Sequence, residues 1–216
     1  MQRKVQAEIL DGLPACNLDA IASRRDLRKI NFLMGNFRWI ESKLLHSPAI
    51  GTPRYLELGA GDGTLARRIL RKYPDAQYSA LDLTPKPEDF PGLVEWLRED
   101  CLKFDAFGDY THILANLFLH HFEADALKEM GKRINESGVN TLIACEPCRR
   151  ELHQWQLRAG KWIGFNWVTL SDGCTSVEAG FRGEELPQLL GLPPDQWTWT
   201  VHETIMGAYR LHATRR

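Results

Sequence analysis

The amino-acid sequence predicts an α/β fold, in which helices cover both faces of a doubly wound, mostly parallel sheet. Apolar runs of strand length alternate with stretches of helical periodicity between residues 54 and 148. A glycine-rich loop at residues 59–63 follows the first run and precedes the first helical stretch. The last two apolar runs, 197–201 and 205–213, alternate with period two across a short link, which predicts a closing antiparallel hairpin.

Length and composition exclude several classes of protein. The chain has 216 residues, of which 44% are hydrophobic and 25% charged, as expected for a globular domain. The net charge of −1 argues against nucleic acid as a partner, because phosphate-backbone binders carry an excess of basic residues. No apolar run reaches the roughly 18 residues of a membrane-spanning helix, so no membrane partner is expected. Five scattered cysteines favour reduced thiols and a cytoplasmic location.

The first 50 residues predict a helical cap. Asn17 is a candidate N-cap, and apolar residues recur at helical spacing on both sides of Gly35. Ser47-Pro48 and Gly51-Thr52-Pro53 then predict a linker. We therefore expect a cap over residues 1–50 and the main domain over residues 51–216.

The main domain contains enough strand-like runs for a seven-stranded sheet. We expect helices from Leu65 to the residue before Pro74, through Leu127, Met130 and Ile134, and near Arg182 to Leu190. The parallel strands are expected at residues 55–58, 78–81, 93–97, 112–115 and 141–144.

The glycine-rich loop has the features of a ligand-binding turn. Gly59 permits a sharp turn, and Gly61 lets a ligand approach the backbone where a Cβ would block it. The first N–H groups of the following helix face such a ligand. Asp82 comes about 20 residues later at the end of a strand, where a carboxylate can accept both hydroxyl groups of a ribose.

The spacing of the glycines separates two classes of cofactor. A dinucleotide fingerprint is G-x-G-x-x-G, whereas this loop is G-x-G-x-G and has Thr64 at the position of the last glycine. Glu57 lies just before the loop, and its carboxylate would repel a pyrophosphate but suit a cationic cofactor. A nicotinamide-dependent oxidoreductase is therefore disfavoured.

The segment Glu57-Leu58-Gly59-Ala60-Gly61-Asp62-Gly63-Thr64 resembles motif I of class I S-adenosylmethionine-dependent methyltransferases. The resemblance covers about residues 54–213 and implies a Rossmann-like sheet whose final hairpin forms strands six and seven. It implies that Asp82 binds the ribose and that Asp100-Cys101 contacts the adenine. The cofactor-binding residues implied in this way are Glu57, Gly59, Ala60, Gly61, Asp82, Leu83, Asp100, Cys101 and Asn116.

The methyl acceptor is expected beside His120 and His121. The segment 116–122 resembles that of small-molecule methyltransferases, including the quinone-biosynthesis type, and Glu146 resembles their strand-five end beside the acceptor. Either imidazole could act as a general base, although methyl transfer needs a base only when the acceptor must lose a proton. Alternatively, one histidine packs at a helix start and the other is solvated. The absence of an (Asp/Asn/Ser)-Pro-Pro-(Tyr/Phe) motif argues against methylation of DNA bases or glutamine.

Cys145 and Cys148 form a C-x-x-C motif that does not predict a metal site. A redox motif requires a helix that begins at the first cysteine, whereas Cys145 is expected to end a strand. Zinc needs two further ligands, and only His153 and Cys174 are near in the sequence. We therefore expect no metal.

Tryptophan is abundant, and the resemblance suggests why. Of seven tryptophans, Trp155, Trp162 and Trp167 follow strand five together with Phe165, in a segment that often lines the acceptor site in this family. A helix buried against the sheet is the alternative. Together with the cap, this segment favours an apolar or aromatic acceptor. Arg38 of the cap could pair with a cofactor or acceptor carboxylate, or could be a solvated helix residue.

We therefore expect a cytoplasmic S-adenosylmethionine-dependent methyltransferase that acts on a small molecule. Two alternatives stay open. One is an RNA or protein methyltransferase, for which Arg24-Arg25, Arg67-Arg68 and Arg149-Arg150 could form a basic patch. The other is a module that binds the cofactor without turnover. An open acceptor pocket would favour an enzyme, whereas a pocket filled with tryptophan would favour the module.

Overall fold

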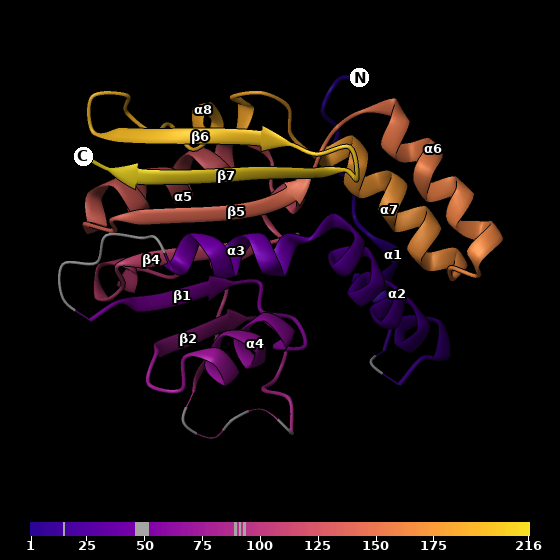
Figure 1. Ribbon diagram of the computed structural model, residues 1–216, viewed down its shortest axis with the longest axis horizontal. Coiled ribbons are helices and arrows are strands. Elements are labelled where there is room, and N and C mark those ends of the chain that lie inside the picture. The colour runs from indigo at the N-terminus through magenta and orange to yellow at the C-terminus, as the bar shows by residue number, and fades with distance from the viewer. Residues whose placement is uncertain (15, 46–51, 89, 91, 93) are drawn as a thin grey trace.

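A computed structural model of the chain describes residues 1–14, 16–45, 52–88, 90, 92 and 94–216. Seven strands form one sheet in the order β3-β2-β1-β4-β5-β7-β6 (Figure 1). Strands β1 to β5 are parallel, whereas β7 runs antiparallel to both β5 and β6. The predicted fold class is confirmed. The strands are β1 Arg54–Leu58, β2 Gln77–Asp82, β3 Glu95–Arg98, β4 His112–Asn116, β5 Thr141–Pro147, β6 Trp197–Glu203 and β7 Ala208–Arg215.

The helices follow the prediction closely before residue 148 and less closely after it. Asn17 caps α2 as expected, since its Oδ1 accepts the N–H groups of Asp19 and Ala20. The helix expected over 182–190 shrinks to the short α8, and two further helices follow β5. The helices are α1 Ile9–Gly12, α2 Leu18–Met34, α3 Asn36–Leu45, α4 Thr64–Lys72, α5 Ala124–Ser137, α6 Glu151–Ala159, α7 Trp167–Ala179 and α8 Glu185–Leu189, with 3-10 turns η1 Ala106–Asp109, η2 Leu119–His121 and η3 Gly160–Ile163.

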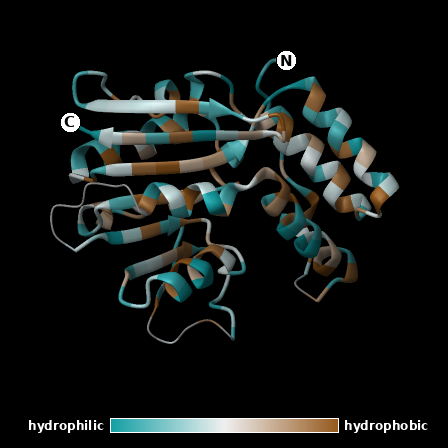
Figure 2. Ribbon diagram, viewed as in Figure 1, coloured by the Kyte–Doolittle hydropathy of each residue, from teal (hydrophilic) through white to brown (hydrophobic). Residues whose placement is uncertain are grey.

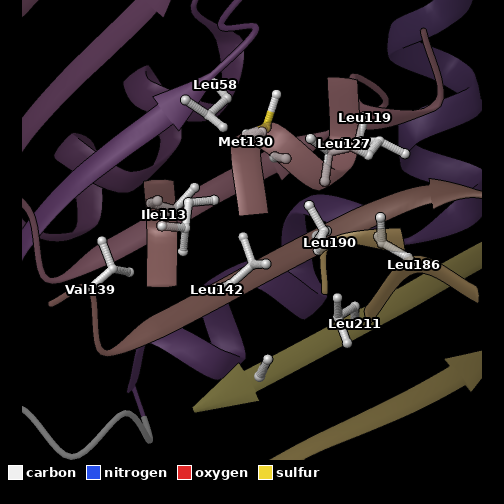
Figure 3. Close-up of a cluster of buried hydrophobic side chains, with 14 of the residues drawn as sticks. Leu58, Ile113, Leu119, Leu127, Met130, Val139, Leu142, Leu186, Leu190 and Leu211 are labelled. Atoms are coloured by element: carbon white, nitrogen blue, oxygen red, sulfur yellow. The ribbon is translucent and has the colours of Figure 1, made fainter. Parts of the chain in front are cut away.

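Hydrophobic side chains form a core on each face of the sheet. One cluster lies between the sheet and α5 and α8, where Leu127, Met130 and Ile134 of α5 are buried as expected (Figure 3). The other lies under α3 and α4. Strand β5 is buried along its whole length, and Figure 2 shows that its hydrophobic residues give way to a hydrophilic one at the arrowhead. That polar end of β5 belongs to the site described below.

Helices α1, α2, α6 and α7 lie beyond the carboxyl ends of the parallel strands (Figure 1). Helix α2 packs its polar residues against α7: Thr169 Oγ1 donates to Ser23 Oγ at 3.1 Å, and Asn166 N–H donates to Asp26 Oδ2 at 2.8 Å. Most large apolar residues of α2 consequently face either solvent, as Leu18, Ile21 and Phe32 do, or the cavity described below. Among the described residues, no helix is both long and apolar enough to cross a membrane.

The expected cap has two parts with different positions. Helix α2 lies at the end of the sheet, whereas α3 lies on its face and contributes Ile40 and Leu44 to the core. The expected linker at Ser47-Pro48 and Gly51, and Leu93 of the expected third strand, lie outside the described residues.

Gly131 lets α5 approach α8 closely. A Cβ at this position would collide with the backbone carbonyl oxygen of Leu190, which cannot move without shifting the chain. We expect Gly131→Ala to lower the free energy of unfolding by about 1–3 kcal/mol, as overpacking does, despite a gain in helix propensity of about 1 kcal/mol.

Urea unfolding of Gly131→Ala and wild type measures this difference. Gly12→Ala is the matched control, because a Cβ at Gly12 would have no neighbour within 4 Å. Equal stability of Gly131→Ala and wild type would contradict the tight α5–α8 contact.

Candidate cofactor and acceptor site

One cavity of about 1150 Å³ runs along the carboxyl end of the sheet, from the glycine-rich loop to η2 and the helices α6 and α7. All nine residues expected to hold the cofactor line it, and so do His120 and His121. Glu146 lies behind the wall and is fully buried. The fold therefore brings the expected site residues together around a single space.

The glycine-rich loop turns where the sequence predicts. Gly59 has a φ of +68° and a Cβ there would collide with the ring of Phe118, so only glycine fits. Gly61 has a φ of +57°, and a Cβ there would meet nothing within 4 Å, which leaves its backbone open to the cavity. The N–H of Gly61 donates to Asp82 Oδ2 at 2.7 Å, and Thr84 binds Asp82 Oδ1. The carboxylate of Asp82 is thus fixed beside the loop.

Asp100 and Cys101 form the wall next to β3. Asp100 Oδ1 accepts the N–H of Leu102 at 3.0 Å, which holds the turn after the strand. Burial raises the pKa of the Cys101 thiol to about 12, with a contribution from the charge of Asp100. Cys101 is therefore a neutral, small side chain at physiological pH.

Glu57 is a buried carboxyl group at the cofactor end of the cavity. It accepts a hydrogen bond from Tyr78 Oη at 2.7 Å. Burial raises the pKa of Glu57 to about 8, and the charges of Asp82 and Asp62 add to the shift. The group is therefore protonated near neutral pH, and a bound cation would favour its ionised form.

Three asparagines meet beside Glu57, two of which the sequence did not indicate. Asn31 Oδ1 accepts from Asn116 Nδ2 at 3.0 Å and from Asn36 Nδ2 at 3.3 Å. The Oδ1 atoms of Asn36 and Asn116 are buried and have no hydrogen-bond partner in the described structure. Buried acceptors of this kind require donors, and Asn116 lines the cavity, so its oxygen suits a ligand that carries an amino group.

A chain of carboxylates and imidazoles forms the other end of the cavity. Glu146 accepts backbone N–H groups from residues 118–120, and its Oε2 lies 2.7 Å from His120 Nδ1. Glu8 Oε1 lies 3.5 Å from His120 Nε2. Burial disfavours the imidazolium, but the hydrogen bond to Glu146 and the nearby carboxylates of Glu146 and Glu8 raise the pKa of His120 to about 9. Burial and the nearby His120 lower the pKa of His121, whose ring centroid lies 4.2 Å from that of His120.

The sequence did not indicate Glu8 or Asp11, which come from the N-terminal segment. Arg3 anchors this segment by donating to the carbonyl oxygens of Ala179, Phe122 and His120. The carboxylate of Asp172 accepts the N–H groups that begin α1. No local pattern indicates this placement, because every partner lies more than a hundred residues away. Leu117, with a φ of +53°, is a local sign that the turn carrying the histidines is strained.

The segment after β5 lines the cavity as expected, through Leu157, Ile163 and Phe165, but the tryptophans expected there do not. Trp155, Trp162 and Trp167 are 68%, 90% and 56% exposed, and no tryptophan is among the described residues that line the cavity. Helices α6 and α7 and the turn η3 between them place these side chains on the exposed side, whereas Trp197 is buried in the core. The apolar lining comes from other residues: Leu10, Leu13, Leu27, Ile30, Leu33, Met34, Phe37, Phe118, Phe122, Leu157, Ile163, Phe165, Val177 and Met206.

Two other motifs are separated from the site. Strand β5 continues to Pro147 rather than ending near Cys145, so Cys145 and Cys148 enter the cores on opposite faces of the sheet. They cannot bind one metal together. Arg38 is exposed and lies over the ring of Phe32.

Three arginines of the pairs considered as a basic patch make ion pairs within the fold. Arg149 is buried and binds the carboxylate of Glu185, and Arg150 binds that of Glu203. Arg68 binds Glu41. These guanidinium groups are therefore engaged within the fold.

The amino-acid sequence matches no protein-family model and no curated protein sequence. The fold, however, is that of known methyltransferases. The plantazolicin methyltransferase BpumL, in complex with a triazolic desmethylPZN analog and SAH, has a TM-score of 0.68 at 13% identity, with 91% of this chain and 89% of that chain covered. Magnesium protoporphyrin IX methyltransferase from Synechocystis PCC 6803 with bound SAH has a TM-score of 0.57 at 11% identity over 96% and 91%. Human N-acetylserotonin methyltransferase in complex with SAM has a TM-score of 0.56 at 14% identity over 95% and 61%. At these identities the likeness establishes the fold, a Rossmann-like methyltransferase fold.

The raised pKa of Glu57 makes stability depend on pH. Between the ordinary value of 4.5 and about 8, the folded protein holds this proton and the unfolded chain does not. The free energy of unfolding therefore falls as the pH rises through this window. We expect Glu57→Gln, which keeps the acceptor for Tyr78, to remove this fall.

Urea unfolding of both proteins at several pH values from about 5 to 9 measures the difference. Glu151→Gln, at an exposed position of α6, should retain the wild-type dependence. Parallel curves for wild type and Glu57→Gln would show that the pKa of Glu57 is not raised.

Proposed function

We propose that this protein is an S-adenosylmethionine-dependent methyltransferase that acts on a small apolar or aromatic acceptor. One observation carries the proposal: a single cavity joins the residues that motif I implies for the cofactor to an apolar chamber that ends at the His120–His121 pair. A methyltransferase must place cofactor and acceptor side by side and away from water, because alignment supplies much of the rate. The open chamber, free of tryptophan, favours an enzyme over a binding module.

The residues at the cofactor end fit S-adenosylmethionine. When bound, it supplies a methyl group on a positively charged sulfur. Asp82 would hold the ribose hydroxyls, and Leu83, Asp100 and Cys101 would contact the adenine. The unpartnered oxygen of Asn116, which lines the cavity, suits its ammonium group. Glu57, close to its ionisation point, complements the positive charge.

The acceptor end fits a molecule that is mostly apolar and carries one acidic proton. His121, whose pKa is lowered by burial and by the nearby His120, is suited to accept that proton. Glu146 orients His120 by binding its Nδ1. The histidine pair after β4 supports a relationship to the quinone-biosynthesis subgroup.

Two further assignments belong to this proposal. The chain divides into a helical cap over residues 1–50 and a methyltransferase domain over residues 51–216, which the position of α2 at the cavity supports. Within the cap, α3 packs on the sheet and so shares the core of the domain. The protein acts in the cytoplasm, a location supported by its five free cysteines.

Binding of the cofactor tests the first half of the proposal. We expect calorimetry to show one site for S-adenosylmethionine and for its demethylated product. Asp82→Ala should weaken both by about 10-fold to 100-fold, because charged hydrogen bonds contribute about 1.5–3 kcal/mol. Asp195→Ala, at an exposed position, is the control and should bind as wild type does. No heat and no thermal shift with either ligand would refute the cofactor assignment.

Transfer of a labelled methyl group tests the second half. We expect aromatic alcohols, rather than sugars, nucleosides or RNA, to become labelled. His121→Ala should reduce turnover by at least about 100-fold, as loss of a general base does, without changing the affinity for S-adenosylmethionine. His202→Ala, on the exposed face of β6, should leave turnover unchanged. Labelling of RNA alone, or full activity of His121→Ala, would contradict this assignment.

A further inference from the structure

The acceptor end of the cavity gathers three potential metal ligands. One ligand atom each from Glu8, His120 and His121 lies within 4.8 Å of the other two. We infer that these three side chains bind one divalent transition-metal cation of the zinc type. The inference differs from the sequence-based expectation of no metal, because that expectation considered only the cysteine pair. Binding of the cation does not depend on the proposed function, but the role of the cation in methyl transfer rests on it.

The hydrogen bonds of His120 prepare its Nε2 as a ligand. Glu146 already accepts three backbone N–H groups, so its carboxylate is suited to accept a hydrogen bond from the Nδ1–H of His120 as well. The proton on Nδ1 leaves Nε2 with a lone pair in the neutral ring. A buried carboxylate behind an imidazole is the usual arrangement for a metal-bound histidine. Nε2 is buried, faces Glu8 and has no hydrogen bond in the described structure.

The distance from Nε2 to Glu8 Oε1 fits two ligands of one cation. It is 3.5 Å, longer than the 2.7–2.9 Å of a charged hydrogen bond. Two tetrahedral ligands with bonds of about 2.0–2.1 Å are separated by about 3.4 Å. In the metal-free protein, a proton on His120 Nε2 faces Glu8. When the cation binds, it takes the position of that proton, and the proton is released to solvent.

The carboxylates around His120 and His121 outnumber the cationic groups there. Asp11 Oδ2 lies 4.0 Å from His121 Nδ1, and Asp172 lies beneath the start of α1. With Glu8 and Glu146 these make four carboxylates around two imidazoles. Arg3, bound to the carbonyl oxygens of His120 and Phe122, offsets part of this charge. A divalent cation would compensate the remainder.

Three protein ligands would leave a fourth position of a tetrahedral cation free for a further ligand. Catalytic zinc sites share this arrangement, and the metal lowers the pKa of an oxygen bound there. If the proposed methyl transfer is correct, the acceptor is an alcohol or phenol. With the cation bound, His121 is a ligand rather than the base described above, so the O–H proton passes to solvent, and the acceptor oxygen forms the O–CH₃ bond while the S–CH₃ bond of the cofactor breaks.

Metal binding by the untagged full-length protein tests the inference. We expect one Co²⁺ per chain, with the absorption of a four-coordinate, nitrogen-ligated ion, and one Zn²⁺ per chain after desalting. Glu8→Gln and His121→Gln should each weaken Co²⁺ binding by more than about 10-fold, since even indirect partners of a ligand contribute 10-fold or more. His202→Gln removes an exposed histidine and should bind Co²⁺ as wild type does.

Three results would overturn the inference: no stoichiometric metal in wild type, the spectrum of hydrated Co²⁺, or equal binding by wild type and both ligand variants. Calorimetry with S-adenosylmethionine shows whether each variant is folded. If the variants do not fold, the Co²⁺ spectrum of the wild-type protein alone decides whether the metal site exists. Normal cofactor binding and methyl transfer without metal would remove the metal site but leave the proposed function intact.

Discussion

The buried carboxylate of Glu146 is the contact on which both halves of the site depend. It ends the apolar run of β5 and binds three consecutive backbone N–H groups of the turn that follows β4. That turn begins at Leu117 with a left-handed backbone, and Glu146 offsets the strain. The same turn places Phe118 against Gly59 of the glycine-rich loop and points His120 toward Glu8. One side chain therefore fixes the cofactor loop and the acceptor end relative to each other.

Most of the fold and the cofactor end could be predicted from the sequence, because the evidence there is local. A strand, a glycine turn and a helix follow one another within 20 residues, and parallel strands bring their carboxyl ends to one edge. Asp82 and Asp100 therefore reach the same cavity as Gly61 without any knowledge of tertiary contacts.

The rest could not be predicted, because it depends on packing between distant elements. Nothing near Glu8 indicates that it faces His120, and Asn31 and Asn36 join Asn116 only because α2 and α3 meet the end of β4. The abundance of tryptophan was misleading about the cavity wall for the same reason. Composition gives the number of tryptophans but not the face of a helix or turn on which each side chain lies. In α2 the usual pattern is reversed, since Ser23 and Asp26 are buried against α7.

The anchor at Arg3 has a consequence for how the protein folds. Its hydrogen bonds join residues 117, 119 and 176 positions apart, so all three can form only once the chain through Ala179 has been synthesised. Residues 1–11 are therefore synthesised long before the partners that hold them, and contacts of such long range are slow to form. Glu8 and Asp11 belong to this segment, so the acceptor end is complete only when the N-terminal segment has docked.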